Sequence, residues 1–140
     1  MTVTIEAIRE ARKLLEGQVI RTPLVPAPRL SQDLDCEIYL KLENLQYTGS
    51  FKDRGAYIKL SSLTPEQARL GVIAMSAGNH AQGVAYHAQR LGIPATIVMP
   101  EFTPYAKVER TKSFGARVVL VGDTLDASAV AAREIAEKDS

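Results

Sequence analysis

An apolar run passes through small and polar residues into a helical pattern in the stretch Val72-Ile73-Ala74-Met75-Ser76-Ala77-Gly78-Asn79-His80. The same alternation occurs three times, with apolar runs at 72–75, 95–99 and 117–121 and helical patterns at 79–91, 104–114 and 124–137. The apolar runs contain few polar residues, which is typical of parallel strands that helices cover on both faces. The sequence therefore predicts an α/β fold, with a parallel sheet and helices on both of its faces.

Two further helices are predicted before this sheet. A helix over 51–62 follows from the near-helical spacing of its apolar residues, and it places Lys52 in the first turn. A shorter helix over 64–70 begins with the capping residue Thr64, followed by Pro65 at the first helical position.

The N-terminal part is less regular. A helix is expected over 4–17, with an apolar face that should pack on another element. Three prolines make 22–28 an extended connector, because proline lacks a backbone donor and pushes its predecessor towards extended geometry. Alternation of apolar and polar residues predicts a strand over 37–43 with one buried face. The lone cysteine, Cys36, is expected to be a small buried residue.

The composition limits the kinds of partner. The chain has 140 residues and a net charge of +1, so it has enough residues for one core and no strong field to attract nucleic acid or an anionic membrane. A single cysteine excludes an internal disulfide, and no apolar stretch reaches the roughly 18 residues of a membrane span. We expect a cytoplasmic protein whose partner is a small molecule, with no nucleic acid and no membrane.

Two loops are candidates for a functional site. One is 48–55, which contains Lys52, and the other is 75–83, which follows a strand and opens a helix. Ligands of open parallel sheets bind beyond the carboxyl ends of the strands, where helix N-termini expose amide donors that suit a carboxylate or phosphate. The alternative is that Ser76 and Asn79 only cap the helix.

Lys52 has two readings. The positive end of a helix dipole disfavours an ammonium group, so a lysine in a first helical turn is closer to the neutral amine that attacks a carbonyl. The alternative is a solvated surface lysine in a weak ion pair with Asp53. His87 is read as a packing or surface residue, because no second ligand lies at metal spacing from it, and no metal site is predicted.

Together, the motifs resemble a known family. Thr48-Gly49-Ser50-Phe51-Lys52 and the run 76–83 are similar to the corresponding motifs of fold-type II pyridoxal 5′-phosphate (PLP) enzymes, most closely the threonine dehydratases. The resemblance implies that Lys52 forms the Schiff base with PLP and moves the Cα proton. It also implies that Phe51 packs near the cofactor ring and that Asn79 bonds the 3′-hydroxyl. The substrate carboxylate would be held by Ser76, Ala77, Gly78, Asn79 and His80.

The implied reaction is dehydration and deamination of L-threonine, and of L-serine, to 2-oxobutanoate or pyruvate and ammonia. The related serine racemases have a serine acid-base group where this chain has Ala77, so racemisation is not expected. Lys-Asp-Arg-Gly at 52–55 instead resembles threonine synthase. Threonine synthase or another β-replacement enzyme is therefore the alternative activity.

The resemblance also bears on domain organisation. The family's glycine-rich phosphate loop and the residue that meets the pyridine nitrogen belong to a later part of its sequences. The chain is therefore expected to be an N-terminal portion, with the start of a large domain at 1–49 and a small α/β domain at 50–140 that is incomplete at its C-terminal end. A homo-oligomer is expected for the full-length protein. The other class of function is a catalytically inert fragment or binding module.

Overall fold

The computed structural model describes residues 3–138, and its centre is a three-stranded parallel sheet. The strands are β3 (Val72–Met75), β4 (Ala95–Met99) and β5 (Arg117–Leu120), in the order β3-β4-β5. Each of the two pairings is parallel, so each connection must cross over the sheet, and a helix provides each crossover. The predicted parallel sheet is confirmed.

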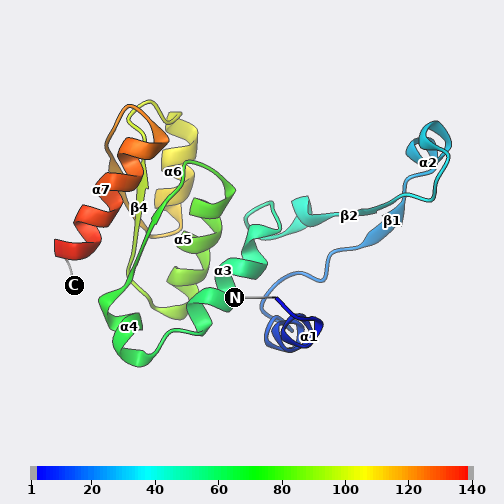
Figure 1. The fold of residues 1–140 in the computed structure, drawn as a ribbon, viewed down its shortest axis with the longest axis horizontal. Coiled ribbons are helices and arrows are strands. Elements are labelled where there is room, and N and C mark those ends of the chain that lie inside the picture. The colour runs from blue at the N-terminus through cyan, green and yellow to red at the C-terminus, as the bar shows by residue number, and fades with distance from the viewer. Residues whose placement is uncertain (1–2, 139–140) are drawn as a thin grey trace.

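Helices cover both faces of this sheet. Helices α5 (Asn79–Leu91) and α6 (Tyr105–Ser113) lie on one side, and α7 (Leu125–Lys138) lies on the other (Figure 1). The central strand β4 alternates between the two layers: Ile97 and Met99 join the core formed with α5 and α6, and Val98 between them is also fully buried. The predicted helices on both faces are therefore confirmed.

Two helices precede the sheet. Helix α3 (Lys52–Ser61) packs along α5, and the short helix α4 (Pro65–Leu70) leads into β3. Thr64 caps α4 through the backbone N–H of Gln67, and the Gln67 side chain accepts from the Thr64 N–H. This reciprocal capping box satisfies two helix-end donors and explains why so short a helix forms.

The N-terminal part projects from the α/β body (Figure 1). It contains α1 (Ile5–Leu14), β1 (Leu24–Pro26), α2 (Pro28–Leu34), β2 (Tyr39–Lys41) and the 3-10 helix η1 (Glu43–Leu45). The expected connector thus contains a strand, β1, which pairs antiparallel with β2. Helix α2 was not predicted, although Pro28 at its first turn is a recognised start signal.

The N-terminal side chains are more exposed than the sequence predicts. Leu40 on β2 is 42% exposed, and Ile5 and Ile8 on α1 are 53% and 54% exposed. The expected burial of these faces is therefore wrong for the described residues. The expectation for Cys36 is also wrong, because its side chain is exposed. None of the helices within 3–138 has both the length and the apolar character of a membrane span.

Candidate functional site

Lys52 begins helix α3, as the sequence predicts. Its backbone N–H donates to Ser50 Oγ at 3.3 Å, and the side chain is half-buried. Within the described chain, Lys52 Nζ has no ion pair and no hydrogen bond; it lies 5.4 Å from the centroid of the Phe51 ring, whose residue is 61% exposed. A primary amine is therefore presented beside an aromatic ring, with no carboxylate bound to it.

The second loop joins β3 to α5. Ser76 N–H donates to Val98 O at 3.0 Å, and Ser76 Oγ accepts from Gly78 N–H at 3.3 Å. The residue at the N-cap of α5 is Gly78, which has no side chain to cap the helix, and Asn79 is the first residue within the helix. The alternative that Ser76 and Asn79 only cap α5 is therefore wrong. Helix α5 begins with backbone donors that remain available to an anion.

The structure brings the two loops together. A Cβ atom added at Gly83 on α5 would lie 3.3 Å from the backbone carbon and oxygen of Lys52, so the absence of a side chain at 83 permits the close approach of α3. Burial lowers the pKa of His80, and the nearby positive charge of Lys52 lowers it further. Lys52 and His80 are thus within electrostatic reach of each other.

The remaining predicted residues lie along the same turn. Ser76, Ala77 and Gly78 are half-buried, and Ala77 packs against the core of the sheet. Asn79 and His80 are exposed, so their side chains are accessible to a ligand. All the predicted site residues are therefore on two adjacent segments at the carboxyl end of the sheet.

Sequence reasoning missed that the residue after Lys52 is a buried acid. Asp53 is fully buried, and its carboxylate accepts from Thr48 N–H at 3.1 Å and from Thr48 Oγ1 at 2.5 Å. His87 Nε2 lies 3.8 Å from Asp53 Oδ1 and is also fully buried. The alternative reading, in which Lys52 is a surface lysine in a weak ion pair with Asp53, is therefore wrong. The spacing of Asp53, Ala56 and Leu60 on one helix face was the available signal for this burial.

A second polar cluster connects α3 to the N-terminal part. Arg54 donates from Nε and Nη2 to the two carboxylate oxygens of Glu43, at 2.9 and 2.7 Å. Thr22 Oγ1 also donates to Glu43, and Gln46 Nε2 donates to both Glu43 and Ile20 O. The bonds from Arg54 lower the pKa of Glu43 to about 2, although burial opposes the shift. This cluster connects the start of α3 to the segment before the Lys52 loop and to the chain near Ile20.

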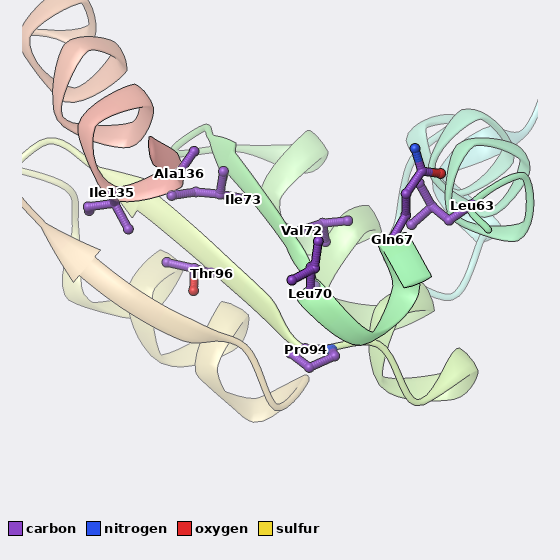
Figure 2. A pocket seen from close by; sticks show the side chains of 10 residues that line it. Leu63, Gln67, Leu70, Val72, Ile73, Pro94, Thr96, Ile135 and Ala136 are labelled. Atoms are coloured by element: carbon purple, nitrogen blue, oxygen red, sulfur yellow. The ribbon is translucent and has the colours of Figure 1, made fainter. Parts of the chain in front are cut away.

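A pocket of about 320 Å³ lies elsewhere and does not belong to this site (Figure 2). It is at the start of β3 and β4, the end of the sheet opposite to the Lys52 and Ser76 loops. It has no titratable residue in its lining, which consists of Leu63, Gln67, Leu70, Gly71, Val72, Ile73, Pro94, Thr96, Ile135 and Ala136. The described part of the chain contains no group of three His, Cys, Asp or Glu residues that could hold a metal ion.

The family model of pyridoxal-phosphate dependent enzymes matches residues 15–140. The chain belongs to this family. The match includes both loops of the site, so the motif resemblance of the PLP enzyme is confirmed. The family depends on PLP, an amine-reactive cofactor, and Lys52 is a half-buried primary amine in the first of the two loops.

Individual PLP enzymes are similar over almost the whole chain. The L-threonine ammonia-lyase of Thermotoga maritima is 52% identical over 97% of this chain and 34% of its own length. The structure of maize serine racemase matches with a TM-score of 0.92 and 32% identity, over 99% of this chain and 42% of that protein. Threonine deaminase isoform 2 of Solanum lycopersicum matches with a TM-score of 0.85 and 42% identity, over 99% and 39%. The chain therefore spans less than half of each relative.

Proposed function

We propose that this protein is a PLP-dependent ammonia-lyase that converts L-threonine, and L-serine, to 2-oxobutanoate or pyruvate and ammonia. The single observation that carries the proposal is the unpaired Lys52 amine at the start of α3, whose backbone lies against α5 at Gly83 and whose charge acts on His80 in the first turn of α5. Two of the similar proteins, from Thermotoga maritima and Solanum lycopersicum, are a threonine ammonia-lyase and a threonine deaminase. Their names support the choice of substrate.

The residues present suit PLP. Schiff-base formation requires the neutral form of the lysine amine, and an ion pair with a carboxylate would favour the charged ammonium instead. The nearest carboxylate in sequence, that of Asp53, is bonded to Thr48 and not to Lys52. We propose that Lys52 attaches the cofactor, that Phe51 packs against its ring and that Asn79 bonds its 3′-hydroxyl. The exposed Phe51 and Asn79 side chains are available for those contacts.

The chain's own groups divide the remaining work. When bound, PLP supplies an electron-accepting ring that makes the substrate Cα proton acidic. Lys52 Nζ would hold and move that proton. The segment 76–80 would bind the substrate carboxylate through backbone donors at the start of α5, where the helix dipole favours an anion. Partial desolvation of the His80 ring lowers its pKa and the nearby charge of Lys52 lowers it further, so both effects favour the neutral ring.

Ala77 supports elimination rather than racemisation. Racemisation needs a second acid-base group on the opposite face of the substrate from the lysine, and a methyl side chain has no proton to give. Ala77 packs against the core of the sheet, which fixes its methyl group at this place. This distinguishes the chain from the serine racemase it matches in shape.

Asp53 no longer favours threonine synthase. The basis for that alternative is the resemblance of Lys-Asp-Arg-Gly at 52–55 to threonine synthase, but the similar proteins include an L-threonine ammonia-lyase and a threonine deaminase, and the Asp53 side chain is fully buried and bonded to Thr48. A fully buried carboxylate is not accessible to a substrate. We retain the ammonia-lyase as the one proposed activity.

The test is product formation by the protein expressed from its complete reading frame. We expect 2-oxobutanoate from L-threonine, and we expect Lys52→Ala to lower kcat by at least about 10³-fold, because covalent and proton-transfer roles are both lost. Lys59→Ala is the matched control, since Lys59 is an exposed lysine near the end of the same helix. Equal losses in the two variants, or no 2-oxobutanoate from the unaltered protein, would reject the proposal.

Three further statements are part of the proposal. A domain boundary near residue 50 is supported by the separate antiparallel pair β1–β2 and parallel sheet β3–β5 on its two sides. We also propose a cytoplasmic homo-oligomer. The rival class, an inert fragment or binding module, predicts that the 140-residue chain gives no saturable absorbance change when it is titrated with PLP.

A further inference from the structure

The buried Asp53 carboxylate joins the loop before α3 to the helix itself. Its two oxygens accept from the backbone N–H and the hydroxyl of Thr48, which is 2% exposed. Arg110 Nη2 on α6 also approaches Thr48 O at 3.5 Å. Thr48 is therefore held from both sides, and the turn 48–53 is closed by a side chain rather than by backbone bonds alone.

His87 lies on the other side of this carboxylate. Arg90 Nη1 is 3.4 Å from His87 Nδ1, and a guanidinium only donates, so Nδ1 accepts and the proton of a neutral ring is on Nε2. That Nε2 faces Asp53 Oδ1 at 3.8 Å, too far for a hydrogen bond. The rings of Tyr57 and Tyr86 pack edge-on against His87, with centroids 5.5 and 4.9 Å away, and fix its orientation.

A buried carboxylate at this position is costly. An aliphatic side chain would fill the space without losing hydration, so stability alone does not explain a carboxyl group beside a histidine with an unpaired Nε2. What the carboxylate adds is orientation. Asp53 follows Lys52 directly, so the bonds that fix Asp53 also fix the helical turn from which the Lys52 side chain extends.

We propose that Asp53, held by Thr48 and facing His87, is a positioning residue that sets the place of Lys52 Nζ relative to the start of α5. The proposal rests on the assignment of Lys52 as the cofactor lysine. It assigns to Asp53 no contact with substrate or cofactor. Thr48 supplies the hydroxyl donor. The Nε2–H of His87 attracts the Asp53 carboxylate and keeps it between α3 and α5.

The test compares two replacements at one position, one that keeps the shape of threonine and one that keeps its hydroxyl, in the protein expressed from its complete reading frame. Thr48→Val removes the hydroxyl donor and Thr48→Ser keeps it. We expect Thr48→Val to raise the Kd for PLP about tenfold, as for the loss of one buried charge-assisted hydrogen bond, and Thr48→Ser to stay within about twofold of the unaltered protein. Asp53→Asn should resemble Thr48→Val, with kcat lowered and KM for L-threonine changed by less than about threefold.

A readout that does not depend on the loaded enzyme comes from the apoprotein. The rate at which Lys52 is reductively methylated, divided by the rate for Lys59 in the same sample, reports the reactivity of the Lys52 amine and hence its local environment. We expect this ratio to change in Thr48→Val and Asp53→Asn but not in Thr48→Ser, at a temperature where circular dichroism finds all variants folded. An unchanged ratio in folded Thr48→Val would overturn the proposal, as would unfolding of Thr48→Val, which would make the hydroxyl a folding determinant.

Failure of the proposed function looks different. If Lys52 is not the cofactor lysine, reduction of the unaltered holoenzyme with borohydride leaves Lys52 unlabelled before any variant is compared. If Lys52 is labelled and Thr48→Val binds PLP as Thr48→Ser does, only the positioning role is rejected.

Discussion

Glu43 is the residue whose ionisation the fold perturbs with the clearest local cause. The Arg54 guanidinium donates to both carboxylate oxygens of Glu43, and the Glu43 side chain is 17% exposed. These bonds lower the pKa of Glu43 from 4.5 to about 2. Because the folded-state pKa is the lower one, the stabilisation is fully present above pH 4.5 and is lost as the pH falls towards 2.

We predict that Glu43→Gln lowers the free energy of unfolding by about 2–3 kcal/mol at pH 7, which is the shift converted at about 1.4 kcal/mol per pKa unit and reduced for partial exposure. The difference from the unaltered chain should shrink towards zero near pH 2. Urea unfolding at several pH values measures it. Glu109→Gln is the control, because its pair with Lys112 is exposed and should contribute less than about 1 kcal/mol. Equal effects at positions 43 and 109 would contradict the account.

At the same scale, the site was only partly predictable from sequence. Lys52, the Ser76 to His80 segment and their helix starts follow from motif and capping patterns that are local in the chain. The Asp53–His87 contact joins residues that are 34 positions apart, and no local pattern encodes such a pair. The helix face of Asp53 indicates burial, but the identity of its partner depends on how α3 crosses α5.

The packing of α3 against α5 decides where Lys52 stands. Gly83 is the point of close approach, and an added Cβ would lie 3.3 Å from Lys52 backbone atoms and 3.5 Å from Ala56 Cβ. Backbone atoms yield less than a flexible side chain, so the two helices would have to separate by a few tenths of an ångström. Lys52, the first residue of α3, would move with that separation.

We predict that Gly83→Ala destabilises the chain by about 1–2 kcal/mol, as overpacking does in a close-packed core, and weakens PLP binding. Gly55→Ala is the matched control on α3, because a Cβ there meets nothing within 4 Å and helix propensity should favour alanine by up to about 1 kcal/mol. Urea unfolding and PLP titration of both variants provide the measurements. The account fails if Gly83→Ala is as stable as Gly55→Ala.

Element boundaries were predictable where a local stop signal exists. The bounds predicted for α5 match the structure at both ends, and at the C-terminal end the signal is Gly92, which adopts the left-handed conformation that terminates helices. Helix α2 was missed because its seven residues lie behind a proline-rich stretch and lack a side-chain cap. It ends at Asp35, which adopts φ 48°, an uncommon backbone conformation that aspartate tolerates better than most residues.

At the scale of the whole molecule, the chain combines a packed α/β body with an N-terminal part that buries little of its own surface. Strand β4 is fully buried at 97–99, whereas no residue of α1 or α2 is buried. Apolar periodicity predicts that a face is suited to burial but not what covers it. This is why burial was predicted well for the sheet and poorly for α1 and β2.

The central claim for the molecule is that Lys52 is the residue that holds PLP. The most direct measurement is borohydride reduction of the holoenzyme, followed by digestion and mass spectrometry to locate the pyridoxyl group. The account predicts one label on Lys52, on the peptide that contains Phe51 and Asp53, and none after Lys52→Ala. A label on another lysine of the unaltered protein, or retention of the label in Lys52→Ala, would contradict it.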